Sequence, residues 1–149
     1  MDEYEIRREK MIVEQIQQRG ITNPGVLGAM RAVPRHLFVP PELRENAYSD
    51  YPLPIGCAQT ISQPYIVALM TSLLNLTGAE KVLEVGCGSG YQAAVLSMLA
   101  REVHTTEIIP QLAAMAAETL RKLDYGNIIV HQCDGSVGWP PEPSHWCTM

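Results

Sequence analysis

Three glycines and two glutamates are the residues of this chain whose spacing suggests binding chemistry. Gly86, Gly88 and Gly90 follow a short apolar run that ends with Glu84 and Val85. Glycines at alternate positions let a backbone turn approach a ligand closely, because no side chain intervenes. Glu107 ends the next strand-like stretch. A carboxylate at such a strand end can accept hydrogen bonds from both hydroxyls of a ribose.

The segments around these residues predict a nucleotide-binding α/β fold. Residues 81–85 form an apolar run typical of a strand that is buried on both faces of a parallel sheet. Residues 92–100 then predict a short helix, and 102–107 a second strand. After Pro110 the pattern predicts a helix at 111–123 and a third strand at 128–132. The inward face of the helix at 111–123 is expected to carry Leu112, Met115, Ala116 and Leu120.

The spacing of the glycines distinguishes between two cofactor classes. A dinucleotide-binding turn has the pattern G-x-G-x-x-G, whereas this chain has G-x-G-x-G. A dinucleotide oxidoreductase is therefore disfavoured, because the third glycine comes one residue too early. The turn resembles that of S-adenosylmethionine-dependent methyltransferases, whose cofactor has no pyrophosphate to seat on the helix.

Composition excludes several classes of function. The chain has 149 residues, a length suited to one domain, and a net charge of −5 without an extended basic patch. We therefore expect no nucleic-acid substrate. The charged first residues predict no signal peptide, and no apolar run approaches the length that spans a membrane. Four dispersed cysteines predict neither a zinc site nor a redox motif, and they suit a reducing cytoplasm.

The first half of the chain, residues 1–78, reads as a helical N-terminal extension and a substrate-side segment. A helix is expected at 4–19, where Gly20 ends it, and a second helix begins at Asn23. The proline-bounded segment 33–40 is expected to be extended.

A third helix of the extension is expected to begin at Pro64, with Ser62 or Gln63 near its N-cap. The N-terminus of a helix has free backbone N–H groups and a partial positive charge, so it attracts a carboxylate. Gly78 would close this helix. Its apolar positions at helical spacing are Ile66, Leu69, Met70, Leu73 and Leu76.

Residues 56–65, with Q-T-I-S-Q-P at their centre, make the resemblance closer. They are similar to the characteristic segment of the protein-L-isoaspartate O-methyltransferase family. Further marks of the family follow in order at 33–39, 83–91, Glu107 and 134–139. The resemblance covers about residues 11–139. It implies methyl transfer from S-adenosylmethionine to the carboxylate of an isoaspartyl residue, the first step in the repair of damaged proteins.

The resemblance also implies the roles of individual residues. Ser62 would orient the substrate carboxylate as a hydrogen-bond donor. Between substrate and cofactor would lie Thr60, Ile61 and Tyr65. The methionine half of the cofactor would be held by Glu84, Gly86, Gly88, Ser89 and Gly90. Glu107 would bind the ribose, while Asp134 and Gly135 would lie on the adenine side; a simple turn is the alternative for that pair.

The chemistry of methyl transfer suits the residues that are present. A carboxylate is already ionised near pH 7, so it needs no general base to attack a sulfonium methyl group. Positioning of the two reactants is then the main task, and no Ser-His-Asp arrangement is required. Ala58 and Cys133 stand where relatives are expected to have glycine.

The end of the chain departs from the family. Residues 79–139 would form the N-terminal half of a Rossmann-like domain, and 140–149 a divergent proline-rich tail. Three prolines within 140–143 cannot pair as a central strand. The family's sheet order is 3-2-1-4-5-7-6, so the chain looks truncated after the third strand. The strand at 81–85 would then be a bare apolar edge.

Two other readings remain besides the isoaspartyl enzyme. One is a different methyltransferase, which residues 59–64 disfavour. The other is a non-catalytic fragment that binds S-adenosylmethionine or pairs with another chain through its exposed strand. The prediction is thus a cytoplasmic, class I S-adenosylmethionine-dependent methyltransferase fold that acts on isoaspartyl proteins, without metal or membrane. Most of the residues that contact the cofactor are expected to be present in this chain, but its methyltransferase activity is expected to be weak or absent.

Overall fold

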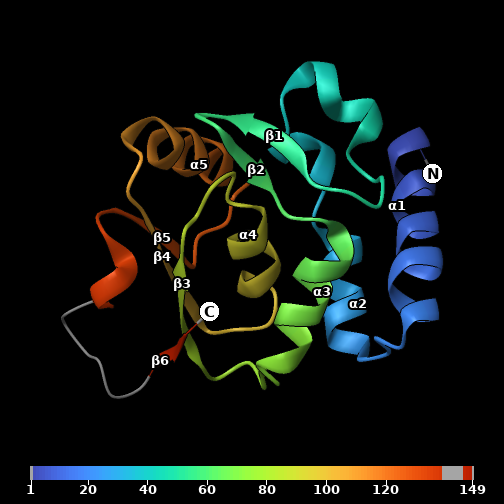
Figure 1. The fold of residues 1–149 in the computed structure, drawn as a ribbon. Coiled ribbons are helices and arrows are strands. Elements are labelled where there is room, and N and C mark those ends of the chain that lie inside the picture. The colour runs from blue at the N-terminus through green and yellow to red at the C-terminus, as the bar shows by residue number, and fades with distance from the viewer. Residues whose placement is uncertain (1, 139–145, 149) are drawn as a thin grey trace.

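The computed structural model describes residues 2–138 and 146–148, and it shows a parallel sheet with helices packed beside it (Figure 1). Within the described residues, this sheet has four strands in the order β5-β4-β3-β6. Every neighbouring pair in it is parallel. In order of appearance along the chain this is 3-2-1-4, which is how a Rossmann-like sheet begins. The prediction of an α/β fold is confirmed.

The elements around the glycine turn lie close to their predicted bounds. They are β3 (Lys81–Val85), α4 (Tyr91–Ser97), β4 (Glu102–Glu107), α5 (Pro110–Lys122) and β5 (Ile128–Gln132). The strands and α4 are held together by an apolar cluster of Val82, Ala93, Leu96, Ala100 and Val103. One of the expected inward residues of α5 is wrong: Met115 is 56% exposed, whereas Leu112, Ala116 and Leu120 are buried.

The N-terminal helices form as predicted. The first, α1 (Glu3–Met11), begins at Asp2, whose side chain and that of Glu5 form a capping box. The helical path continues through a π-helical stretch and a short 3₁₀ turn to Gly20, which has φ of 93° and ends it. Helix α2 (Pro24–Ala32) is capped by the side chain of Asn23. None of the described helices is long and apolar enough to cross a membrane.

The N-terminal helices share one hydrophobic core with the sheet domain. Ile12 and Ile16 from the first helical segment and Met30 from α2 are completely buried. They belong to the same cluster as Tyr91 and Val95 of α4. The extension therefore stabilises the helix that follows the glycine turn, because that helix is packed between it and the sheet.

The segment at 33–40, which the sequence predicted to be extended, is not extended throughout. Residues Arg35–Phe38 form a 3₁₀ helix in which the Leu37 amide donates to the Pro34 carbonyl at 2.9 Å. This turn places the Arg35 and Phe38 side chains in the core. The flanking prolines restrict only their own neighbourhoods, so burial of these two side chains determines the conformation between them.

A β-hairpin that the sequence reading missed lies next to this segment. It consists of β1 (Leu53–Gly56) and β2 (Gln59–Ile61), which pair antiparallel. Its turn residues, Cys57 and Ala58, have φ of 52° and 55°. Such turns usually contain glycine or asparagine, and their absence here explains why the hairpin was missed.

The helix predicted at 64–76 is shorter and turned differently from expectation. Helix α3 (Pro64–Leu73) ends early, since Asn75 adopts a left-handed φ of 50°. Its buried residues are Pro64, Val67, Ala68 and Thr71. By contrast, Met70 and Leu73 from the expected inner face are 39% and 74% exposed. Two neighbouring apolar stripes run along this helix, and periodicity alone did not show which one meets α2 and α4.

The expectation of a bare edge at β3 is wrong over part of its length. A short strand, β6 (Trp146–Thr148), pairs in parallel with Lys81–Leu83 of β3. The three prolines of the tail lie outside the described residues. Residues 146–148 contain no proline, so their N–H groups are free to pair with the neighbouring strand. The chain therefore contributes a fourth strand to the sheet, one more than the sequence reading predicted.

Candidate functional site

The glycine turn between β3 and α4 has a backbone that only glycine adopts readily. Gly86, Gly88 and Gly90 have φ of 89°, 55° and 86°. The turn is anchored to β4, because the amides of Gly86 and Cys87 both donate to the Thr106 carbonyl, at 2.9 and 2.8 Å. The sequence thus places a glycine-rich loop, anchored to β4, at the carboxyl end of the sheet, where ligands bind in such folds.

Glu107 reaches this turn from the end of β4. Its Oε2 accepts a hydrogen bond from the Gly88 amide at 2.8 Å, and its Oε1 accepts one from the Ile109 amide at 3.0 Å. The residue is 6% exposed. Each carboxylate oxygen can accept a second hydrogen bond, so Glu107 can still receive a hydroxyl group.

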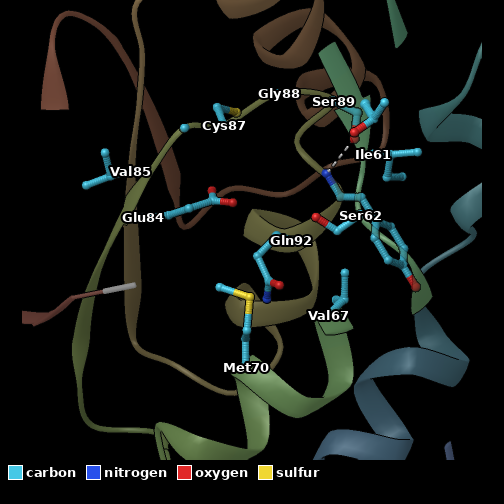
Figure 2. Close-up of a pocket in the computed structure, with 13 residues that line it drawn as sticks. Ile61, Ser62, Val67, Met70, Glu84, Val85, Cys87, Gly88, Ser89 and Gln92 are labelled. Atoms are coloured by element: carbon cyan, nitrogen blue, oxygen red, sulfur yellow. Dashed lines mark hydrogen bonds between the residues drawn. The ribbon is translucent and has the colours of Figure 1, made fainter. Parts of the chain in front are cut away.

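A pocket of about 190 Å³ lies below the turn, between β3, α4, β2 and the start of α3. Figure 2 shows the Glu84 side chain pointing from β3 into this space, towards Ser62, Gln92 and Met70. The predicted site residues that line it are Thr60, Ile61, Ser62, Glu84, Gly86, Gly88 and Ser89. Segments that are far apart in the sequence, β2 and the glycine turn, therefore form two walls of one pocket.

Several other predicted site residues lie elsewhere. Tyr65 packs against Arg19, whose guanidinium carbon is 4.3 Å from the ring centroid, and it is not among the residues that line the pocket. Gly90, the last glycine of the turn, is the N-cap residue of α4 and does not line the pocket. Asp134 is exposed and its carboxylate accepts the Ser136 amide at 2.9 Å.

Gly135 packs closely against the ends of two strands. A Cβ atom at this position would fall on the Oγ1 of Thr106 and within 2.9 Å of a Val85 methyl group. Glycine is needed here because of this close approach, whatever the residue contributes to ligand binding.

The sequence reading missed some of the pocket lining. Gln92 lies in the first turn of α4, and its amide donates to the Thr71 hydroxyl at 2.9 Å. Its position two residues after the last glycine is a signal that could have identified it. Met70 was noted only as an apolar position at helical spacing, and such spacing does not distinguish a face that meets a pocket from one that meets the core. The remaining missed residues are Val67, Val85, Cys87 and Tyr91.

The Ser62 edge of the pocket is held by a buried arginine. Arg35 is completely buried; its Nη2 donates to the Ser62 carbonyl at 2.8 Å and its Nε to the Ala47 carbonyl at 2.6 Å. Its guanidinium carbon also lies 4.9 Å from the ring centroid of Tyr91. Burial lowers the pKa of Arg35 from its ordinary value. This side chain fixes the backbone just before α3, whose N-cap residue, Gln63, makes no side-chain capping bond.

The electrostatics of the pocket are dominated by Glu84. Glu84 is 4% exposed, and the Thr105 hydroxyl donates to its Oε2 at 2.6 Å. Burial raises the pKa of Glu84 to about 8; the Thr105 hydrogen bond acts in the opposite direction, and the charge of Glu107 raises it further. Burial, and next the charge of Glu84, also raise the pKa of the Cys87 thiol. Within the described part of the chain, no group of three or more His, Cys, Asp or Glu side chains could hold a metal ion.

Comparisons with known proteins agree on one family. The family model described as protein-L-isoaspartate(D-aspartate) O-methyltransferase matches residues 6–145. A protein-L-isoaspartate O-methyltransferase 1 from Syntrophobacter fumaroxidans is 58% identical over 142 residues, which are 95% of this chain and 66% of that protein. A protein-L-isoaspartate O-methyltransferase from a Synechococcus species is 57% identical over 139 residues, 93% of this chain and 57% of that protein. The chain thus spans less than two thirds of each relative.

Solved structures show the same likeness. A protein-L-isoaspartate O-methyltransferase superposes with a TM-score of 0.82 at 26% identity, over 95% of this chain and 47% of that one. A Plasmodium falciparum protein assigned to the same activity, in complex with S-adenosyl-L-homocysteine, gives a TM-score of 0.69 at 22% identity. That match covers 89% of this chain and 64% of the other, and it supports the fold alone.

Proposed function

Because the chain belongs to the protein-L-isoaspartate(D-aspartate) O-methyltransferase family, we propose that it binds S-adenosylmethionine and methylates isoaspartyl carboxylates in damaged proteins. The observation that carries the proposal is the pocket that joins Ser62 to the glycine turn and Glu84. One wall presents a hydroxyl group near a helix N-terminus, which suits an anion, and the other presents a buried acid, which suits a cation. Methyl transfer from a sulfonium to a carboxylate needs both.

The residues at the turn fit the cofactor. The left-handed glycines leave room for a ligand against the backbone, and Glu84 has no cationic partner among the described residues that line the pocket. When bound, S-adenosylmethionine supplies an electrophilic methyl group on a positively charged sulfur. In the proposal its methionine half is held by Glu84, Gly86, Gly88, Ser89 and Gly90. Glu107 binds the ribose, with Asp134 and Gly135 on the adenine side.

At the Ser62 side of the pocket, the task of the protein is to orient the isoaspartyl carboxylate. An isoaspartyl carboxylate is ionised near pH 7 and is itself the nucleophile, so the protein need not remove a proton. Ser62 is exposed at the pocket edge and can donate its hydroxyl hydrogen to that carboxylate, while Thr60 and Ile61 lie between the two reactants. Uncapped amides at the start of α3 add positive potential. Tyr65 lies outside this arrangement, because its ring packs against Arg19.

Binding is the first test of the function. Thermal unfolding of the purified chain is measured with and without S-adenosylmethionine, which at 100 times its dissociation constant adds about 2.7 kcal/mol to a folded binder. A cooperative transition that does not move with the cofactor contradicts the proposal.

A cytoplasmic location stays a prediction from the cysteine content.

Transfer is the second test. Methyl incorporation into an isoaspartyl peptide is compared for the wild type, Ser62→Ala and Ser72→Ala, a control whose hydroxyl donates to the Leu69 carbonyl outside the pocket. Loss of a hydrogen bond to a charged group costs roughly 1.5–3 kcal/mol, so Ser62→Ala should transfer about 10- to 150-fold more slowly. Equal rates for Ser62→Ala and the wild type exclude the role of Ser62. Cofactor binding without transfer favours the non-catalytic reading.

A further inference from the structure

The pocket contains one acid and no base to neutralise it. Among the described residues that line the pocket, Glu84 is the only Asp, Glu, Lys, Arg or His. Its side chain points into the pocket rather than towards solvent (Figure 2). An ionised carboxylate in such a place is costly unless a cation or several hydrogen bonds stabilise it, so an empty pocket favours the neutral acid.

The neighbours of Glu84 from each packed element do little to stabilise its charge. From β4 come the Thr105 hydroxyl, which donates one hydrogen bond, and the carboxylate of Glu107. The glycine turn contributes the buried Cys87 thiol. Across the pocket lie the amide of Gln92 from α4 and the thioether of Met70 from α3. One hydrogen bond favours the ionised form, while burial and a nearby negative charge oppose it.

We propose that Glu84 carries a proton while the pocket is empty and releases it to solvent when the cationic cofactor binds, so that cofactor affinity is linked to pH. The inference rests on the proposed function, because it takes S-adenosylmethionine as the ligand. The cofactor brings a sulfonium and an ammonium group, and either next to Glu84 stabilises the carboxylate. No other group needs to gain the proton, since the pocket opens to water.

The electrostatics of the unliganded site give the size of the effect. With a pKa of about 8, Glu84 is about 0.9 protonated at pH 7. Binding of the cation should then release about 0.9 proton at pH 7. Below pH 7 the association constant should rise almost tenfold for each unit of pH, because each binding event competes with one proton.

The experiment is isothermal titration calorimetry with S-adenosylmethionine at pH 6, 6.5 and 7, in pairs of buffers with different enthalpies of ionisation. Dependence of the observed heat on the buffer gives the number of protons released. The cofactor's own α-amino group, with a pKa of about 7.7–8.0, remains mostly protonated in this range. Glu84→Gln should reduce proton release to near zero and flatten the pH dependence of the association constant. Glu118→Gln, which removes an exposed partner of Lys122 on α5, should behave like the wild type.

The outcomes separate the two proposals. Binding without proton release in the wild type overturns the role of Glu84 and leaves the proposed function intact. Equal proton release in the wild type and Glu84→Gln also overturns it, because the proton then comes from another group. If S-adenosylmethionine binds at none of the three pH values, the proposed function and this inference are both overturned.

Discussion

Two glutamates at the carboxyl ends of neighbouring strands show how similar burial can lead to opposite roles. Glu84 at the end of β3 is 4% exposed and Glu107 at the end of β4 is 6% exposed. Glu107 accepts hydrogen bonds from two backbone amides, those of Gly88 and Ile109. Among the residues that the structure describes, Glu84 accepts one hydrogen bond, from the Thr105 hydroxyl. Glu107 is thus part of the framework that holds the glycine turn, whereas Glu84 is left to interact with a ligand.

The difference comes from the backbone around each acid. Glu107 precedes a tight connection to α5, so the amide two residues later turns back to its carboxylate. Glu84 lies inside a strand whose amides are used in the sheet, and its side chain can meet only other side chains or a ligand.

The largest effect should appear in the pH dependence of stability without ligand. The raised pKa means that the folded state binds more protons than the unfolded state between about pH 4.5 and 8. The free energy of unfolding should therefore fall as pH rises through that window, by on the order of 4 kcal/mol. Urea unfolding of the wild type and Glu84→Gln from pH 5 to 8 measures it as the difference between the two proteins. A constant difference between the two proteins would contradict a raised pKa of Glu84 in the folded state.

The second prediction disturbs both strand ends at once. Gly135→Ala would force a methyl group against Thr106, which precedes Glu107, and against Val85, which follows Glu84. Overpacking of this kind costs about 1–3 kcal/mol, and we expect the upper part of that range. Urea unfolding should show the same loss at pH 5 and pH 8, because no titrating group is removed. Gly126→Ala, where a Cβ meets nothing within 4 Å, is the matched control.

The third prediction concerns removal of the charge of Glu107. In Glu107→Gln one carboxylate oxygen becomes an NH₂ group, so either the Gly88 or the Ile109 amide loses its acceptor. An unsatisfied buried amide costs about 2 kcal/mol. Thermal unfolding at pH 8 should show Glu107→Gln to be less stable than the wild type, whereas Glu84→Gln should be at least as stable. The contrast fails if the two variants shift stability in the same direction.

The smallest effect concerns the hydrogen bond that Glu84 accepts from Thr105. Thr105→Val keeps the shape of the side chain and removes the hydroxyl that favours the ionised carboxylate. The cost of ionising Glu84 should increase by about 1 kcal/mol, which moves the upper end of its pH transition up by roughly 0.7 pH unit. Urea unfolding of both proteins, with the pH series extended to about pH 10, detects this shift. An unchanged transition would mean that the hydroxyl does not stabilise the carboxylate.

Much of the fold could be predicted because strong local patterns determine it. Strands β4 and β5 and the start of α5 at Pro110 lie where the apolar runs and the proline indicate. Hairpin β1–β2 could not be predicted, since Cys57 and Ala58 adopt left-handed conformations that their residue types disfavour. The edge strand β6 was not predicted, because the prolines that precede it in the sequence argued against a strand in the tail.

The candidate site was predictable where residues are adjacent in the sequence and less so where packing brings them together. The glycine turn and Glu84 follow directly from spacing. The opposite wall, with Gln92 and Met70, depends on how α3 and α4 are rotated, and helical periodicity leaves two apolar stripes of α3 equivalent. Tyr65 was expected near the ligand because of its position in the family segment, but its side chain packs against Arg19.

Residue types along the chain were enough to predict the strands at 81–85, 102–107 and 128–132, the glycine turn after the first of them, and an acid at the end of each of two strands. These features depend on local backbone preferences and on the apolar pattern along a few residues. The tertiary structure alone decided what each acid does. Whether a buried carboxylate meets backbone amides, as Glu107 does, or faces an open pocket, as Glu84 does, depends on distant segments that fold around it. A charge is stabilised by everything within a few ångströms, and most of those atoms are remote in the sequence.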